Sequence, residues 1–277
     1  MAAAAEGRVS GRPAAAGRAL RAEWTKLRTL RSTGWLLFAL AASTVAAGAA
    51  AMWPVDTANC PSPARCFEDT PRLSLSGVRV GQVAAVVLGV LAIGGEYGTR
   101  TIVPTLAAVP RRGLVLAAKA AVVAVLVAAA GAAGVAGSLV AGRFILPRGG
   151  FTAAAGYPPL SVLDGPTARA AAGSVLYLVL VALLGLGAAA AARGTAGGLT
   201  GVLGLLWAAP VVVPLLGDDR WQERLERFAP MPAGLAVQAT RALDRLPVGP
   251  WAGLGVLAGW AVPALLLGWA VLARRDA

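Results

Sequence analysis

The sequence has few of the groups that enzymes use for chemistry. It contains no histidine, two cysteines and, among 25 basic residues, only two lysines. Without histidine, histidine-ligated metal sites and Ser-His or Cys-His catalysis are excluded. A P-loop for ATP needs a lysine directly after glycine, and neither lysine follows one. We therefore expect a chain that is not an enzyme and has no catalytic, cofactor-binding or metal site.

Charged residues are also scarce, and long stretches of the chain contain almost none. Charged residues make up 14% of the sequence and hydrophobic residues 57%, against about 25% and 45–50% in soluble domains. A helix needs about 20 apolar residues to cross a bilayer. Six segments meet this need: 35–53, 78–95, 114–141, 171–192, 195–216 and 251–272. The sequence therefore predicts an all-α integral membrane protein with about six transmembrane helices.

The distribution of charge predicts the orientation of these spans. We divide the chain into a basic tail (1–34), a transmembrane domain (35–272) and a short C-terminus (273–277). With the tail in the cytoplasm, the inner segments hold 14 basic and four acidic residues, which leaves 11 and nine outside. The positive-inside rule therefore puts both termini in the cytoplasm. The preference for Arg over Lys, with abundant Ala and Gly, is typical of a bacterial genome rich in G and C. Together with the spans, it predicts a location in a bacterial cell membrane.

Residues 18–31 have the pattern of an amphipathic helix at the membrane surface. Leu20, Trp24 and Leu27 fall on one helical face. Glu23 can pair with the lysine three residues later. The cations lie on other faces and suit an anionic inner leaflet: Arg18, Arg21, Lys26 and Arg28. Membrane lipids are thus an expected partner, whereas a plain basic flank is the alternative. Basic residues elsewhere are scattered between apolar runs, so we expect no nucleic acid partner.

Two outer segments carry further structure. The loop 54–76 holds Cys60 and Cys66, and an oxidising exterior favours a disulfide between them; two free thiols are the alternative. The segment 217–250 is predicted to hold an amphipathic helix and then a second, short or re-entrant helix over Ala233–Ala242. The amphipathic face is formed by Trp221, Leu225 and Phe228.

The spans themselves hold almost no ionisable groups. Lys119 is five or six residues into the third span, and we expect its ammonium to reach back to the inner surface. Small residues are dense, and we expect several to let helices pack closely: Gly131, Gly134, Gly137, Gly197, Gly201, Gly255 and Gly259.

The inner loop between spans two and three, residues 96–113, has an ordered mixture of groups. Its polar groups suit a partner protein: Glu96, Tyr97, Arg100, Arg111 and Arg112. Its apolar side is formed by Ile102, Leu106 and Val109. A short helix over about 98–108 would display both sides. The alternative is a plain loop that only fixes topology.

The same loop carries a resemblance to a known family. It contains an acid–aromatic pair, a threonine, a leucine, a Pro-Arg-Arg and a lysine in the next helix: Glu96-Tyr97, Thr101, Leu106, Pro110-Arg111-Arg112 and Lys119. In these residues the chain resembles the ABC-2 type permeases, the membrane subunits of a class of ATP-driven transporters. Arg100 departs from the pattern, since the family usually has glycine before the threonine. The stretches Glu23–Thr29 and Phe228–Gly234 are also similar to family elements.

The resemblance implies a function and partners. The 96–113 loop would be a coupling helix that docks into a separate ABC ATP-binding subunit, which would use ATP and Mg²⁺. A second permease copy, identical or related, would complete the translocation path. The substrate class suggested by the apolar spans is an amphiphilic or hydrophobic molecule, and export follows from the family alone. The alternative is a membrane scaffold or regulatory protein that binds a cytosolic partner and transports nothing.

Overall fold

The chain folds into a bundle of long helices. The computed structural model describes residues 3–60, 68–102, 104–105, 112–157, 159–161, 164–215 and 218–274. Within those ranges the protein is all-helical, with 86% helix and no strand. Six helical segments are long and apolar enough to cross a membrane, which confirms the predicted count. This is the arrangement of a multi-pass membrane protein.

The six spans lie close to their predicted positions. They are α2 (Arg31–Met52), α4 (Val78–Gly98), α6 (Arg112–Ile145), α7 (Gly165–Ala192), α8 (Thr195–Val212) and α11 (Pro250–Arg274). A short helix, α3 (Thr70–Ser74), leads into α4. Helix α7 starts six residues before the predicted span, since Pro166 in its first turn fixes a helical φ and needs no N–H partner.

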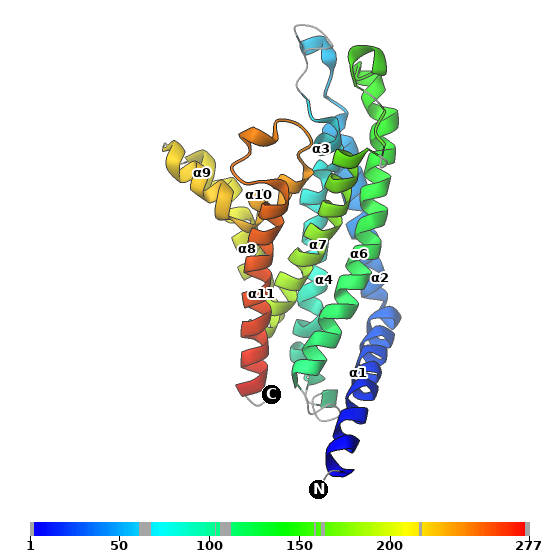
Figure 1. Cartoon of the computed structure of the whole chain (residues 1–277), viewed down its shortest axis with the longest axis vertical. Coiled ribbons are helices and arrows are strands. Elements are labelled where there is room, and N and C mark those ends of the chain that lie inside the picture. Colours follow the sequence, from blue (N-terminus) through cyan, green and yellow to red (C-terminus); the bar gives the residue numbers. More distant parts are fainter. Residues whose placement is uncertain are drawn as a thin grey trace.

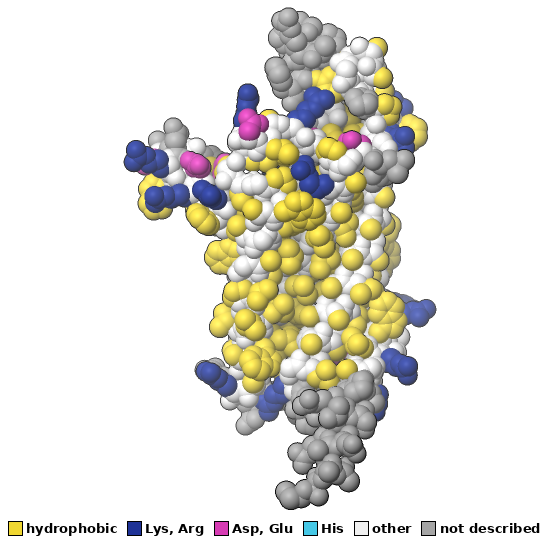
Figure 2. Space-filling model, in the orientation of Figure 1, with side chains coloured by type: hydrophobic (Ala, Val, Ile, Leu, Met, Phe, Trp, Pro, Cys, Tyr) yellow, Lys and Arg dark blue, Asp and Glu magenta, His cyan; other side chains and the backbone are white. Residues whose placement is uncertain are grey.

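The helices share one long axis, and both chain ends lie at the same end of the bundle (Figure 1). We call this the inner end, because the sequence predicts it to be cytoplasmic, and the opposite one the outer end. Helix α7 packs against α4, α6 and α11, while α2 packs against α4 and α6. On the face shown in Figure 2, hydrophobic side chains form a belt around the middle. Acidic side chains appear there only above the belt, while basic ones appear on both sides of it.

The outer end holds two helices after span five, and the second lies earlier than its predicted position of 233–242. It begins at Pro230, because proline suits the first turn of a helix, and ends at Leu235. Helix α9 (Asp219–Phe228) extends sideways from the bundle (Figure 1), and its Trp221 and Phe228 are exposed. Helix α10 (Pro230–Leu235) is instead buried against α11 and α8. Its Met231 accepts a hydrogen bond of 3.2 Å from Gln82 of α4. Thus α10 belongs to the helix core, whereas α9 lies outside it.

Glycines set the closest helix approaches, although mostly not those predicted. A Cβ added at Gly89 of α4 would lie 2.0 Å from the carbonyl oxygen of Ala182 in α7, so only glycine fits there. Of the predicted set, Gly131, Gly134, Gly137 and Gly197 have neighbours within 3.1 Å of such a Cβ. Gly201, Gly255 and Gly259 have none within 4 Å, so they set no close helix approach in the part of the chain that the structure describes.

The approach at Gly89 can be tested by adding a side chain. We predict that Gly89→Leu separates α4 from α7 and destabilises the protein by about 3 kcal/mol or more, at the upper end of overpacking effects. Gly204→Leu in α8 is the matched control, since a Cβ there meets open space. Thermal unfolding in detergent measures both. Equal unfolding temperatures for the two variants would contradict the close contact.

Candidate functional site: an ion cluster at the inner end

Both lysines of the chain join one group of charges at the inner end. We call Glu23, Lys26, Glu96 and Lys119 the ion cluster. The Nζ atom of Lys119 lies 2.7 Å from Oε2 of Glu23 and 2.5 Å from Oε1 of Glu96. The ammonium of Lys26 pairs with the same Glu96 oxygen. The cluster therefore connects α1 (Ala3–Thr29), α4 and α6, and its formal charges cancel.

Three of the four members are buried. Lys119 is 0% exposed, Glu23 5% and Glu96 6%, while the side chain of Lys26 is 37% exposed. Removing a charge from water costs several kcal/mol, which only close opposite charges offset. Lys119 therefore needs both carboxylates. The expectation that it reaches back to the inner surface is wrong, because Glu23 and Glu96 bring opposite charge to it inside the bundle.

Helix α1 supplies one carboxylate through a face that differs from the predicted one. Within its second half, residues 16–29, the buried side chains are Ala19, Glu23 and Leu27, one turn apart, and α1 packs against α6. Leu20 and Trp24 remain 40% and 39% exposed. Glu23 bonds to Lys119 and Lys26 to Glu96, instead of to each other. The predicted helix at 18–31 exists but begins earlier, and Figure 1 shows α1 descending steeply below the bundle.

Both ends of the predicted coupling loop, 96–113, contact other helices. The ring of Tyr97 lies under the guanidinium of Arg193, 5.7 Å away, at the turn between α7 and α8. At the start of α6, Arg112 donates a hydrogen bond of 2.7 Å to the carbonyl of Leu272 in the last turn of α11. Such a cation also suits the negative end of the α11 dipole. A displacement of this loop would therefore be transmitted to most of the helices in the bundle.

The predicted loop residues have different surroundings. Glu96 is part of α4 and buried, so it is not displayed on a loop as expected. Arg100 and Thr101 follow the helix and are exposed. Arg100 has φ of 58°, a left-handed conformation that glycine adopts at little cost. The other predicted members lie outside the described residues: Leu106, Pro110 and Arg111.

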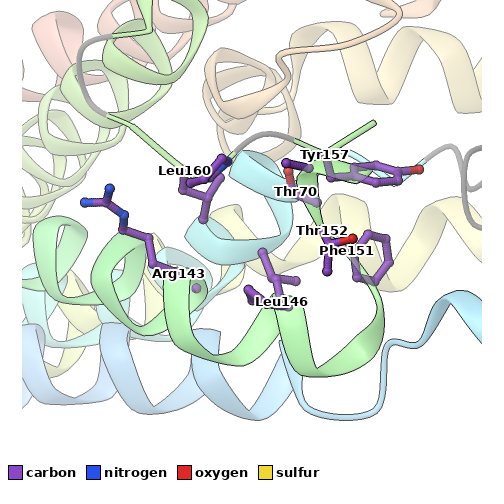
Figure 3. A pocket seen from close by; sticks show the side chains of 11 residues that line it. Thr70, Arg143, Leu146, Phe151, Thr152, Tyr157 and Leu160 are labelled. Atoms are coloured by element: carbon purple, nitrogen blue, oxygen red, sulfur yellow. The ribbon is translucent and has the colours of Figure 1, made fainter. Parts of the chain in front are cut away.

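The outer end holds a cavity and a disulfide-bonded cysteine. A cavity of about 220 Å³ lies between the end of α6 and the following loop. Phe151 and Tyr157 meet edge to face at its wall, with ring centroids 5.0 Å apart, and Arg143 extends away from them (Figure 3). Cys60 of the outer loop is disulfide-bonded, and Cys66 lies outside the described residues. Among the residues described, no group of acidic or cysteine side chains is placed to hold a metal ion.

Comparisons with known proteins add no identity to this geometry. No protein-family model matches the sequence, and no curated protein matches it.

The ion cluster was not predicted from the sequence. The signal that could have found it is a lysine within an apolar run, which requires a carboxylate from elsewhere in the chain.

The two lysines offer a matched test of the cluster. We predict that Lys119→Met, which leaves Glu23 and Glu96 buried without that cation, destabilises the protein by about 3–5 kcal/mol. Lys26→Met removes a partly exposed ammonium from the same carboxylate and should cost about 1 kcal/mol or less. Thermal unfolding of both variants in one detergent gives the comparison. A larger loss for Lys26→Met would show that the assigned partners are wrong.

Proposed function

We propose that this chain is the membrane-spanning permease subunit of an ABC transporter in a bacterial cell membrane. A separate ATP-binding subunit would hydrolyse ATP with Mg²⁺, and a second permease copy would complete the path. The substrate would be amphiphilic or hydrophobic and would be exported. Both termini and the 99–111 segment would face the cytoplasm, which the charge distribution supports.

The observation that carries this proposal is the attachment of the 99–111 segment. On one side Glu96 and Tyr97 bond to α1, α6 and the α7–α8 turn, and on the other Arg112 bonds to α11. A loop that only fixed topology would not need contacts to four other parts of the bundle. A loop that receives force from a partner would need them, since packed and hydrogen-bonded elements can transmit displacement.

The ion cluster would pass such a displacement from the segment to other helices. A displacement of the segment acts directly on Glu96, and Glu96 is bonded to the cations of α1 and α6. Because separating these buried charges is costly, the three helices would move together. Closure of the ATP-binding subunits would thus tilt α4 and α6 as a unit and change access to the space between two permease copies.

Arg100 tests docking of the partner. We predict that Arg100→Glu weakens association with the ATP-binding subunit at least about tenfold, because it reverses an exposed charge in the docking segment. The measurement is co-purification of the two subunits in mild detergent, followed by titration. Nucleotide-stimulated transport should fall in parallel, while the amount of permease inserted into the membrane stays unchanged.

Arg100→Gly is the matched control for the backbone. Glycine retains the left-handed turn at this position and removes the cation without adding an anion. Its loss of affinity should be smaller than that of Arg100→Glu. Glu96→Ala is a poorer test of docking, because it breaks the ion cluster. If wild-type protein binds an ATPase yet moves no substrate with it, the scaffold alternative gains support.

A further inference from the structure

A cavity of about 310 Å³ opens beside the ion cluster, between the α1–α2 junction and α4. This volume is at the lower end of the range for small-molecule sites, about 300–1,000 Å³. Most of its wall is apolar, and Leu30 and Leu91 on its wall are 48% and 39% exposed on the protein surface. The cavity is therefore accessible from the side of the bundle.

On the α4 side, the lining of this cavity changes from apolar to polar toward the inner end. Along α4 and the turn that follows it, Leu88, Leu91 and Ala92 come first, and Glu96, Thr99 and Thr101 follow. On the opposite wall, Leu36 lies further from the inner end along α2 than Thr33. An amphiphile of the inner leaflet has the same polarity, with its chain toward the membrane centre and its head toward the cytoplasm.

Glu96 supplies a specific group at the polar end. Its Oε1 atom accepts both lysines, whereas its Oε2 atom is buried and has no hydrogen-bond partner among the described residues. A buried acceptor without a donor costs about 1–3 kcal/mol, more when charged. The terminal torsion of glutamate is soft, so a small rotation of the carboxylate would offer Oε2 to a donor in the cavity.

The surrounding charges decide which donor suits this oxygen. Two ammonium groups already contact Glu96, and a third cation would be repelled by them. A carboxylate head would be repelled by Glu96 itself and has no proton to donate at neutral pH. A hydroxyl donates a hydrogen bond without adding charge, and the hydroxyl side chains of Thr33, Thr99 and Thr101 on the cavity wall suit such a head.

From this geometry we propose that the cavity is a binding site for a membrane amphiphile with one acyl chain and a neutral, hydroxyl-bearing head. The acyl chain lies against Leu36, Leu88 and Leu91, and a head hydroxyl donates to Oε2 of Glu96. The occupant completes the hydrogen bonding of the ion cluster. This site is independent of the proposed transport function, because binding requires neither ATP nor a partner subunit.

The test uses three probes with the same oleoyl chain: monooleoylglycerol, methyl oleate and oleylamine. Each is added at the same mole fraction to the full chain in detergent, and thermal unfolding is followed. Monooleoylglycerol should raise the unfolding temperature with saturation, whereas methyl oleate, which lacks a donor, and oleylamine, which adds a cation, should bind at least tenfold more weakly. Equal effects of the three probes, or no effect of monooleoylglycerol, would overturn the proposal.

Glycines in the same helix provide matched variants. A Cβ at Gly95, which lines the cavity, meets open space, so Gly95→Leu fills the site without displacing the backbone. It should abolish the response to monooleoylglycerol, and Gly95→Ala should reduce it in part. Gly98→Leu, in the same helix and outside the cavity lining, should respond as wild type does. An undiminished response in both Gly95 variants would place the probe elsewhere and refute the site.

Discussion

The burial of Lys119 is the constraint on which the inner half of this protein depends. An ammonium ion inside a helix bundle is tolerated only where carboxylates reach it closely, and here they come from two different helices. Helix α1 therefore cannot separate from the spans without leaving a buried cation short of a partner, even though Leu20 and Trp24 on its surface remain exposed. The same requirement holds the end of α4 against α6 and so fixes where the exposed segment after α4 begins. One buried charge thus organises three elements.

The spans were predictable because a single local property determines them. Apolar runs of about 20 residues have few alternatives to a membrane helix, and the six segments and the exposed amphipathic α9 follow from such runs or periods. The tail was predicted to be helical only over 18–31, whereas α1 begins at Ala3. The ion cluster was not predictable in this way. Its partners are separated by 23, 70 and 96 residues along the chain. From the sequence alone, a local i, i+3 pair between Glu23 and Lys26 was an equally reasonable prediction. The buried lysine decides the outcome, because an exposed pair is worth little.

The glycines illustrate the same limit. Spacing by four residues drew attention to Gly201, Gly255 and Gly259, where an added Cβ would meet no other helix among the described residues. Gly89, which has no glycine four residues away, lies where an added Cβ would collide with the backbone of α7, and that depends on the rotation of both helices about their axes. Composition determines which segments become helices, but it does not determine their rotation. The candidate site was therefore predicted only in part: the sequence singled out Glu96, Tyr97 and Arg112, but not the pairing of Glu96 with both lysines.

A double-mutant cycle between Glu96 and Lys119 tests the central claim most directly. The free energy of unfolding is compared for wild type, Glu96→Gln, Lys119→Met and the variant carrying both changes. If the two side chains form a buried ion pair, the losses are strongly non-additive, with an interaction energy of about 1–3 kcal/mol. Because Glu23 also contacts Lys119, the double variant should still be less stable than wild type. Losses that add to within about 0.5 kcal/mol would contradict the account, since independent sites behave in that way.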